Sequence, residues 1–164
     1  MSLKPISSQT GRPVRITSLS FIDQPLDTVT KLVDQEASKG VDLIALPETW
    51  PGQKKNAPET LEGPVIAKMV ALAKKHHTYI VCPIDRQAGE QRLNSAVLLD
   101  RQGEIVCIYD KVYPYWEEFD LMPAVDIGTT CLQTTLTKPF RFYMAIANNR
   151  CHINVAPQGQ RVIA

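Results

Sequence analysis

The sequence lacks any apolar run near the roughly 18 residues that a membrane-spanning helix needs, so no membrane segment is expected. It also lacks an excess of one charge: 18 Lys+Arg stand against 17 Asp+Glu, a net charge of +1. This balance gives no electrostatic reason to bind nucleic acid or an anionic membrane. Residues 1–12 are polar and have no signal-peptide core, which predicts an N-terminal tail and a cytoplasmic protein.

Metal and phosphate motifs are missing as well. The four cysteines form no C-x-x-C pair, and His76 and His77 are adjacent rather than at zinc-ligand spacing. Cys82 and Cys107 lie in apolar, strand-like runs, where buried and inert thiols are expected. The eight glycines are too scattered for a phosphate-binding loop. No cofactor and no metal site are therefore expected.

What the sequence does contain is an alternation of strand and helix patterns, typical of an α/β domain. At 164 residues and 44% hydrophobic content, residues 13–164 fit a single domain. Helices are predicted from Pro25 to before Gly40, and from residue 63 through the basic stretch at 74–77. The expected strands cover residues 14–21, 41–46 and 79–84.

A hairpin follows these elements. Residues 95–99 and 104–109 flank a turn in which Gly103 supplies a positive φ, so the sheet is expected to be mixed. The last third is less regular: residues 129–137 are rich in threonine, and residues 140–147 are apolar without a firm period. No closing set of helices or strands that would cover the second face of the sheet is identified there.

Two positions could carry chemistry. Glu48 directly follows the second predicted strand, where open α/β sheets place their ligands. Lys111 directly follows the hairpin, among aromatic and acidic residues that could desolvate its ammonium or keep it charged. On position alone, a solvated loop glutamate and a surface lysine are the more common explanations.

Together, the two positions resemble the nitrilase superfamily of carbon–nitrogen hydrolases. The segment 41–48, which ends in Pro47 and Glu48, is similar to that family's first catalytic motif. The segments 94–96 and 109–111 are similar to its second. The resemblance implies an α-β-β-α sandwich with mixed sheets, which this chain carries incompletely in its last third.

The resemblance also implies roles for particular residues. The family uses a Glu–Lys–Cys triad, in which Glu48 would be the general base and Lys111 would stabilise the oxyanion. These roles agree with elementary chemistry, because a thiol attacks best as a thiolate and a fixed cation offsets developing negative charge. Family members often carry a second glutamate just beyond the lysine, and either Glu117 or Glu118 fits that position.

The nucleophile is where the sequence departs from the family. The expected Ile-Cys-Tyr/Phe-Asp motif does not occur, and its segment is interpreted as absent near residues 136–139, with a second absent stretch near 154–155. Residues 142–154 resemble a later helix-to-strand segment of the family. Cys131 is a weak candidate nucleophile, because it lacks the strained turn and following backbone N–H that an oxyanion hole requires.

The resemblance therefore predicts an amidase- or nitrilase-type hydrolase of non-peptide C–N bonds that acts through a thioester. Its substrate would be a small amide, nitrile or carbamoyl compound, and a dimer or larger homo-oligomer is expected. The alternative is a truncated, non-catalytic protein that acts as a binding module or an oligomer subunit. Four aromatic residues could line the substrate pocket or simply pack loops onto the sandwich: Trp50, Tyr113, Tyr115 and Trp116.

Overall fold

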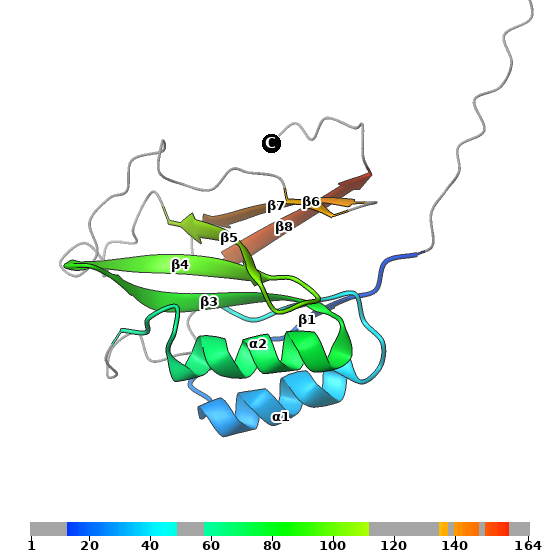
Figure 1. Cartoon of the computed structure of the whole chain (residues 1–164), viewed down its shortest axis with the longest axis horizontal. Helices are drawn as coiled ribbons and strands as arrows, with labels where there is room; N and C mark the ends of the chain where they lie inside the picture. Colours follow the sequence, from blue (N-terminus) through cyan, green and yellow to red (C-terminus); the bar gives the residue numbers. More distant parts are fainter. Residues whose placement is uncertain (1–12, 49–57, 112–134, 138–139, 148–149, 158–164) are drawn as a thin grey trace, which may run out of the picture.

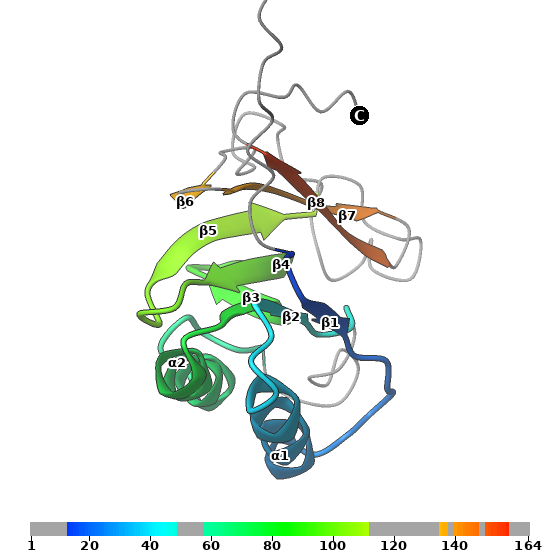
Figure 2. The same cartoon turned by 90° about the vertical axis from the view of Figure 1, so that its right-hand side faces the viewer.

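The fold is layered, with helices on one side of a large sheet and a small sheet on the other side (Figures 1 and 2). The structure is a computed structural model, and it describes residues 13–48, 58–111, 135–137, 140–147 and 150–157. This arrangement confirms the predicted α/β class with a mixed sheet. The described residues form three layers of the expected sandwich: one layer of helices and two sheets.

The large sheet has the strand order β1-β2-β3-β4-β5. The first three strands are parallel, and the last two are added by antiparallel hairpins. Parallel strands need crossover connections, which the two helices provide. The strands are β1 (Ile16–Ser18), β2 (Leu43–Ala45), β3 (Tyr79–Ala88), β4 (Gln91–Leu99) and β5 (Ile105–Asp110).

The two helices are α1 (Leu26–Ala37) and α2 (Pro64–His76), close to the predicted ranges. Pro25 lies at the N-cap of α1 rather than at its first helical position. Gly40 lies beyond the end of α1 and adopts a φ of 73° in the turn that follows. Of the basic residues predicted for the last turn of α2, Lys74, Lys75 and His76 lie there, at the negative end of the helix dipole, and His77 is the C-cap with a φ of 50°.

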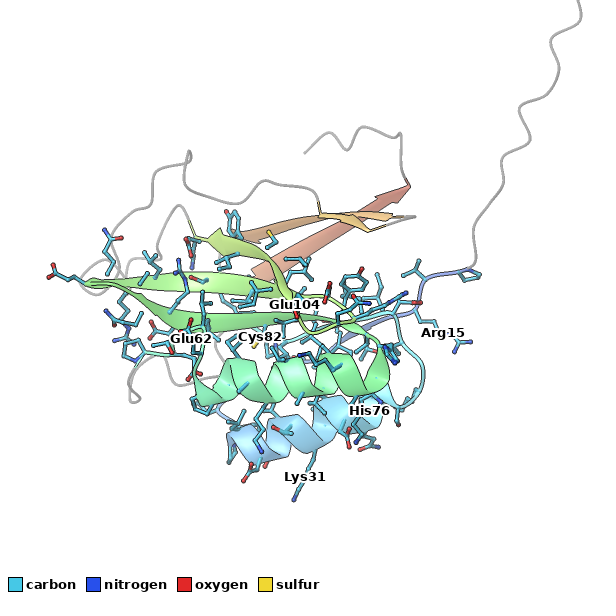
Figure 3. All side chains as sticks on the ribbon, in the orientation of Figure 1. Arg15, Lys31, Glu62, His76, Cys82 and Glu104 are labelled. Atoms are coloured by element: carbon cyan, nitrogen blue, oxygen red, sulfur yellow. The ribbon has the colours of Figure 1, made fainter. Side chains whose placement is uncertain are left out.

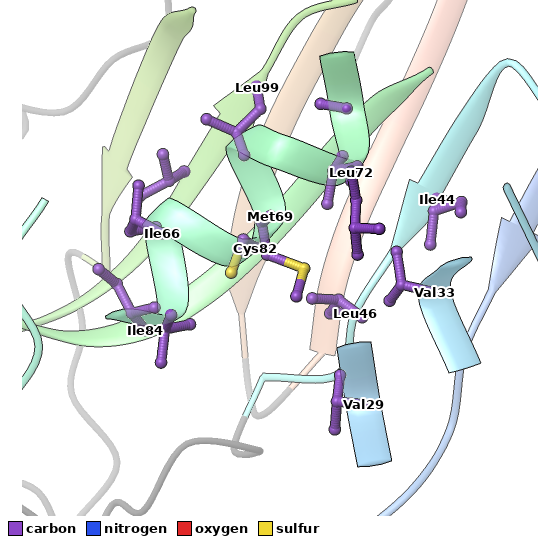
Figure 4. Close-up of a cluster of buried hydrophobic side chains, with 14 of the residues drawn as sticks. Val29, Val33, Ile44, Leu46, Ile66, Met69, Leu72, Cys82, Ile84 and Leu99 are labelled. Atoms are coloured by element: carbon purple, nitrogen blue, oxygen red, sulfur yellow. The ribbon is translucent and has the colours of Figure 1, made fainter. Parts of the chain in front are cut away.

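The main hydrophobic core lies between the helices and the large sheet (Figure 4). Met69 of α2 is fully buried in it, beside side chains from α1 and from the sheet. A second cluster occupies the other face of the large sheet and includes Leu43, Val81, Leu98 and Tyr109. The sheet therefore has two buried faces, as its nearly continuous apolar strands require.

The second face is covered by a three-stranded antiparallel sheet. It consists of β6 (Thr135–Thr137), β7 (Phe140–Ala147) and β8 (Arg150–Pro157), in the order β6-β7-β8, and β7 contacts β4 and β5. The prediction that the last third has no closing set of strands was therefore wrong. The helix implied for the segment from residue 142 was also wrong, because a run rich in aromatic and apolar residues pairs along its length with β8.

The hairpin of β4 and β5 is confirmed, with a φ of 75° at Gly103. Beyond the predicted strand at residues 79–84, β3 continues to Ala88 and pairs with β4 from Gln91 on, which forms a hairpin not predicted from the sequence. Asp85 in this extension is the register partner of Asn94.

A polar contact fastens the two helices to each other at the end of α2. Asp34 of α1 accepts a hydrogen bond of 2.7 Å from Lys75 Nζ and lies 2.6 Å from His76 Nε2 (Figure 3 labels His76). These hydrogen bonds, that from His76 first, hold the pKa of Asp34 below its ordinary value of 3.8. The contact therefore stabilises the fold while Asp34 is ionised, and it is lost as the pH falls through the lowered pKa.

We expect Asp34→Asn to lower the free energy of unfolding near neutral pH, and the difference from wild type to shrink below about pH 4. Urea unfolding of both proteins at several pH values measures this. Glu90→Gln, which removes an equal charge from the exposed β3–β4 turn, is the control and should change stability little at any pH. A difference for Asp34→Asn that stays constant down to about pH 3 would contradict the assignment.

Candidate active site

Glu48 lies just beyond the end of β2, in the middle region of the large sheet. The N–H of Leu46 donates to the carbonyl of Val81 at 3.0 Å, which continues the pairing of β2 with β3 past the last assigned strand residue. Pro47 follows, and Glu48 is buried. Its carboxylate is thus held at the carboxyl end of a parallel strand, the position predicted from the sequence.

Lys111 is placed by the last hydrogen bond of the β4–β5 ladder. Its backbone N–H donates to the carbonyl of Asn94 at 2.8 Å, one residue beyond the paired residues Ser95 and Asp110. Because side chains alternate along a strand, Asn94 and Lys111 share the face of the sheet on which Ala96 lies, the face turned toward β7. The hairpin therefore brings this pair to one edge of the sheet.

The three side chains meet in a buried polar cluster. Lys111 Nζ donates to Glu48 Oε1 at 3.0 Å, and Asn94 Nδ2 donates to the same oxygen at 2.8 Å. The side chains of Glu48 and Lys111 are each 2% exposed. Glu48 Oε2 is also buried, and it has no hydrogen-bond partner within the part of the chain that the structure describes. One carboxylate oxygen is therefore fully engaged, and the other is open to accept a proton.

A second ion pair lies next to this cluster on the same face. Asp85 is the register partner of Asn94 and is bound by Arg92, whose Nε lies 2.7 and 2.6 Å from its two carboxylate oxygens. The hydrogen bond to Asp85 raises the pKa of Arg92. Because Asp85 is satisfied by its own guanidinium partner, two carboxylates are matched by two cations at this edge.

The opposite face of the same strands carries a separate network. Arg86 Nη2 donates to both oxygens of Asp110 at 2.8 Å, and Arg86 Nε donates to Ser95 Oγ at 2.9 Å. Ser95 Oγ in turn donates to Asp110 at 2.5 Å. This network ties β3, β4 and β5 together directly behind Asn94 and Lys111, and so it fixes the backbone from which those two side chains project.

The structure brings together two of the residues predicted for the site and adds one. In the sequence, Asn94 was identified only as part of a motif. The feature that could have singled it out is that a polar amide side chain precedes the apolar residues of its strand. The other predicted residues lie outside the described residues: Trp50, Tyr113, Tyr115, Trp116, Glu117, Glu118 and Cys131.

Both thiols predicted to be inert, those of Cys82 and Cys107, are buried. Cys82 packs near Met69 in the core between α2 and the sheet, on the face opposite Lys111, and burial raises the pKa of its thiol (Figure 4). Cys107 lies four residues before Lys111, about 13 Å along the strand at roughly 3.3 Å per residue. Neither thiol can reach the open oxygen of Glu48.

Across the described residues, no group of three or more His, Cys, Asp or Glu side chains is placed to hold a metal ion. In the same part of the chain, no helix is long and apolar enough to cross a membrane.

The sequence pattern of the carbon–nitrogen hydrolase family matches residues 17–155. The chain belongs to this family. The match extends over both Glu48 and Lys111 and confirms the resemblance seen in the sequence. No curated protein matches the chain in sequence.

Solved structures show the same fold. A carbon–nitrogen hydrolase from Helicobacter pylori G27 superposes with a TM-score of 0.56 at 21% identity, over 70% of this chain and 45% of its own. An amidase from Nesterenkonia sp. gives 0.56 at 18% identity, over 84% and 53%. An N-terminal amidase gives 0.60 at 17% identity, over 88% and 38%. The carbon–nitrogen hydrolase chain described here thus spans about half the length of these structures or less.

The buried pair makes a thermodynamic prediction. Lys111→Met should lower the free energy of unfolding by about 3–5 kcal/mol, because it leaves the carboxylate of Glu48 buried without its cation. The double variant Glu48→Gln/Lys111→Met should recover much of that loss, since it removes both charges. Urea unfolding of the two single variants and the double variant tests this. Additive losses in the double variant would show that the two side chains do not interact.

Proposed function

We propose that this protein is the base- and cation-bearing part of an amidase-type carbon–nitrogen hydrolase, with Glu48 as general base and Lys111 as oxyanion stabiliser. The observation that supports the proposal is the buried pair of Glu48 and Lys111, with Glu48 Oε2 open among the described residues. A purely structural ion pair has no use for a buried, unpartnered carboxylate oxygen, because such an atom lowers stability.

In the proposed reaction, Glu48 Oε2 accepts the proton of a cysteine thiol, and the thiolate attacks the carbonyl carbon of an amide. The oxyanion of the tetrahedral intermediate is stabilised by the Lys111 ammonium. The C–N bond then breaks, the leaving nitrogen takes the proton from Glu48, and a thioester remains. Water attacks the thioester and gives its proton to Glu48; the acid leaves, and the proton returns to the thiolate.

Cys82 and Cys107 cannot supply this thiol, because neither reaches Glu48. We propose that it belongs to a segment that the family carries at the place of residues 136–139, with Cys131 as the alternative within the chain. Glu117 or Glu118, which follow Lys111 closely in sequence, is proposed as the second acid near the base.

The substrate class that we propose is a small amide. One related structure holds an amidase with butyramide, and another holds an N-terminal amidase with an Asn-Glu peptide. Both ligands carry a primary amide, the group that the proposed reaction converts to an acid and ammonia. Trp50, Tyr113, Tyr115 and Trp116 are proposed to line the acyl side of the pocket.

The proposed function predicts release of ammonia from butyramide or from an Asn-Glu peptide, with a nitrile and an N-carbamoyl compound as comparison substrates. Glu48→Gln and Lys111→Met should each reduce kcat by about 10²–10⁴-fold, because each removes a group that acts on the reacting atoms. Glu104→Gln and Lys68→Met, which change exposed residues of the same types, are matched controls and should keep wild-type rates. Equal rates in Glu48→Gln and Glu104→Gln would exclude Glu48 as the base.

A second candidate function is supported by the missing nucleophile motif and by the half-length match to the related structures. In this case the protein is a non-catalytic member that acts as a binding module or as a subunit of an oligomer. Intact mass and a peptide map across Thr134 to Phe140 separate the two functions. Extra peptides in this interval, with a mass above 18.3 kDa, support the hydrolase. A mass of 18.3 kDa, with no iodoacetamide-reactive thiol and no ammonia release, supports the non-catalytic function.

A further inference from the structure

A carboxylate has two chemically equivalent oxygens, and rotation about its last side-chain bond exchanges them. A general base is effective only when one oxygen is held toward the proton that it removes, and a misplacement of about 1 Å can cost about 100-fold in rate. The site must therefore contain a group that binds one oxygen of Glu48 and not the other.

The hydrogen bonds around Glu48 are strongly asymmetric. Lys111 Nζ and Asn94 Nδ2 both donate to Oε1, whereas Oε2 receives no donor from the described residues although it is equally enclosed. An ionised carboxylate only accepts hydrogen bonds, so the atom of Asn94 that faces it must be the amide nitrogen. Asn94 is therefore the donor and Glu48 the acceptor in this hydrogen bond.

Lys111 alone cannot create this asymmetry. An ammonium on a four-carbon stem has three rotatable donors and can serve either carboxylate oxygen. The amide of Asn94 is planar and short, and its backbone is held by the hydrogen bond from the Lys111 N–H at 2.8 Å. On the other face, Ser95 is tied to Asp110, which prevents the strand from turning. Asn94 is therefore the rigid donor of the pair.

The neutrality of Asn94 also suits the role. A second cation at this position would stabilise the charged carboxylate further and so make it a weaker proton acceptor. An amide fixes the orientation without adding charge. Among the described residues, Lys111 is then the only positively charged side chain that binds Glu48, and in the proposed reaction the same charge stabilises the oxyanion.

We propose that Asn94 is a positioning residue for the general base, which occupies Oε1 of Glu48 and thereby presents Oε2 to the thiol. This inference rests on the proposed function, because it assigns the orientation of the same base. It differs from that function in naming one oxygen as the proton acceptor and one neutral side chain as the group that selects it.

The test compares Asn94→Leu, which keeps the approximate volume but removes the donor, with Thr78→Val. Thr78 is also a buried polar residue, and its Oγ1 donates to the carbonyl of Val41 at 2.9 Å just before the start of β3, whereas Asn94 pairs with Asp85 further along that strand. With butyramide as substrate, Asn94→Leu should lower kcat by about 10- to 100-fold with KM within about twofold. Thr78→Val should lower thermal stability yet keep kcat within about threefold. Equal losses of kcat in both variants would mean that Asn94 acts only through stability, and would overturn the proposal.

A second measurement separates this proposal from the proposed function. Crystal structures of wild type, Asn94→Leu and Thr78→Val report the orientation of the Glu48 carboxylate directly, with or without activity. We expect a rotated or doubly oriented carboxylate in Asn94→Leu alone. An unchanged carboxylate in that variant overturns the positioning role. If wild type releases no ammonia from any amide, the proposed function fails, and the crystal structures alone decide the role of Asn94.

Discussion

The candidate site depends on the burial of one ion pair, formed by Glu48 and Lys111. Each charge loses its water, and the attraction between them repays that loss only when the geometry is close to ideal and further hydrogen bonds are present. The two residues are 63 positions apart in the chain and follow different strands. Their contact therefore requires that β2, β3, β4 and β5 pair in the correct register. The site is thus a sensitive reporter of the fold of the whole sheet.

The period of two along β4 and β5 explains how this sheet carries two polar networks without mixing them. Asn94 and Lys111 face β7, while their chain neighbours Ser95 and Asp110 face the helices and bind Arg86. A slip of one residue would exchange the two networks between the faces and leave several charges unpaired, so the register is strongly specified. By favouring this register, the network with Arg86 also determines that Asn94 and Lys111, the two residues that bind Glu48, lie on the face toward β7.

The sequence predicted those parts of the molecule whose local signals agree with their tertiary roles. The apolar stripes, Gly63-Pro64 at the start of α2, and Gly103 in the hairpin indicated the large sheet and its helices, and strand ends indicated Glu48 and Lys111. The end of the β3–β4 hairpin was not predicted, because residues 85–92 are mostly polar and carry no apolar alternation. The second sheet was missed because its strands are stabilised by pairing with one another, which no local pattern displays. Asn94 was not assigned a role, since its hydrogen bond to Glu48 joins residues 46 positions apart.

The geometry also constrains where a nucleophile can lie. The side chains of Asn94 and Lys111 reach Glu48 from the face of the large sheet that β7 contacts, so a thiol in the core on the helix side is separated from them by the sheet. This excludes Cys82, which projects into the helix-side core, whatever its ionisation. The nucleophile segment that the sequence predicts to be absent near residues 136–139 would lie at the end of β6 and before β7. In the proposed triad, the large sheet therefore supplies the base and the cation, and the thiol comes from the part of the chain that follows β5.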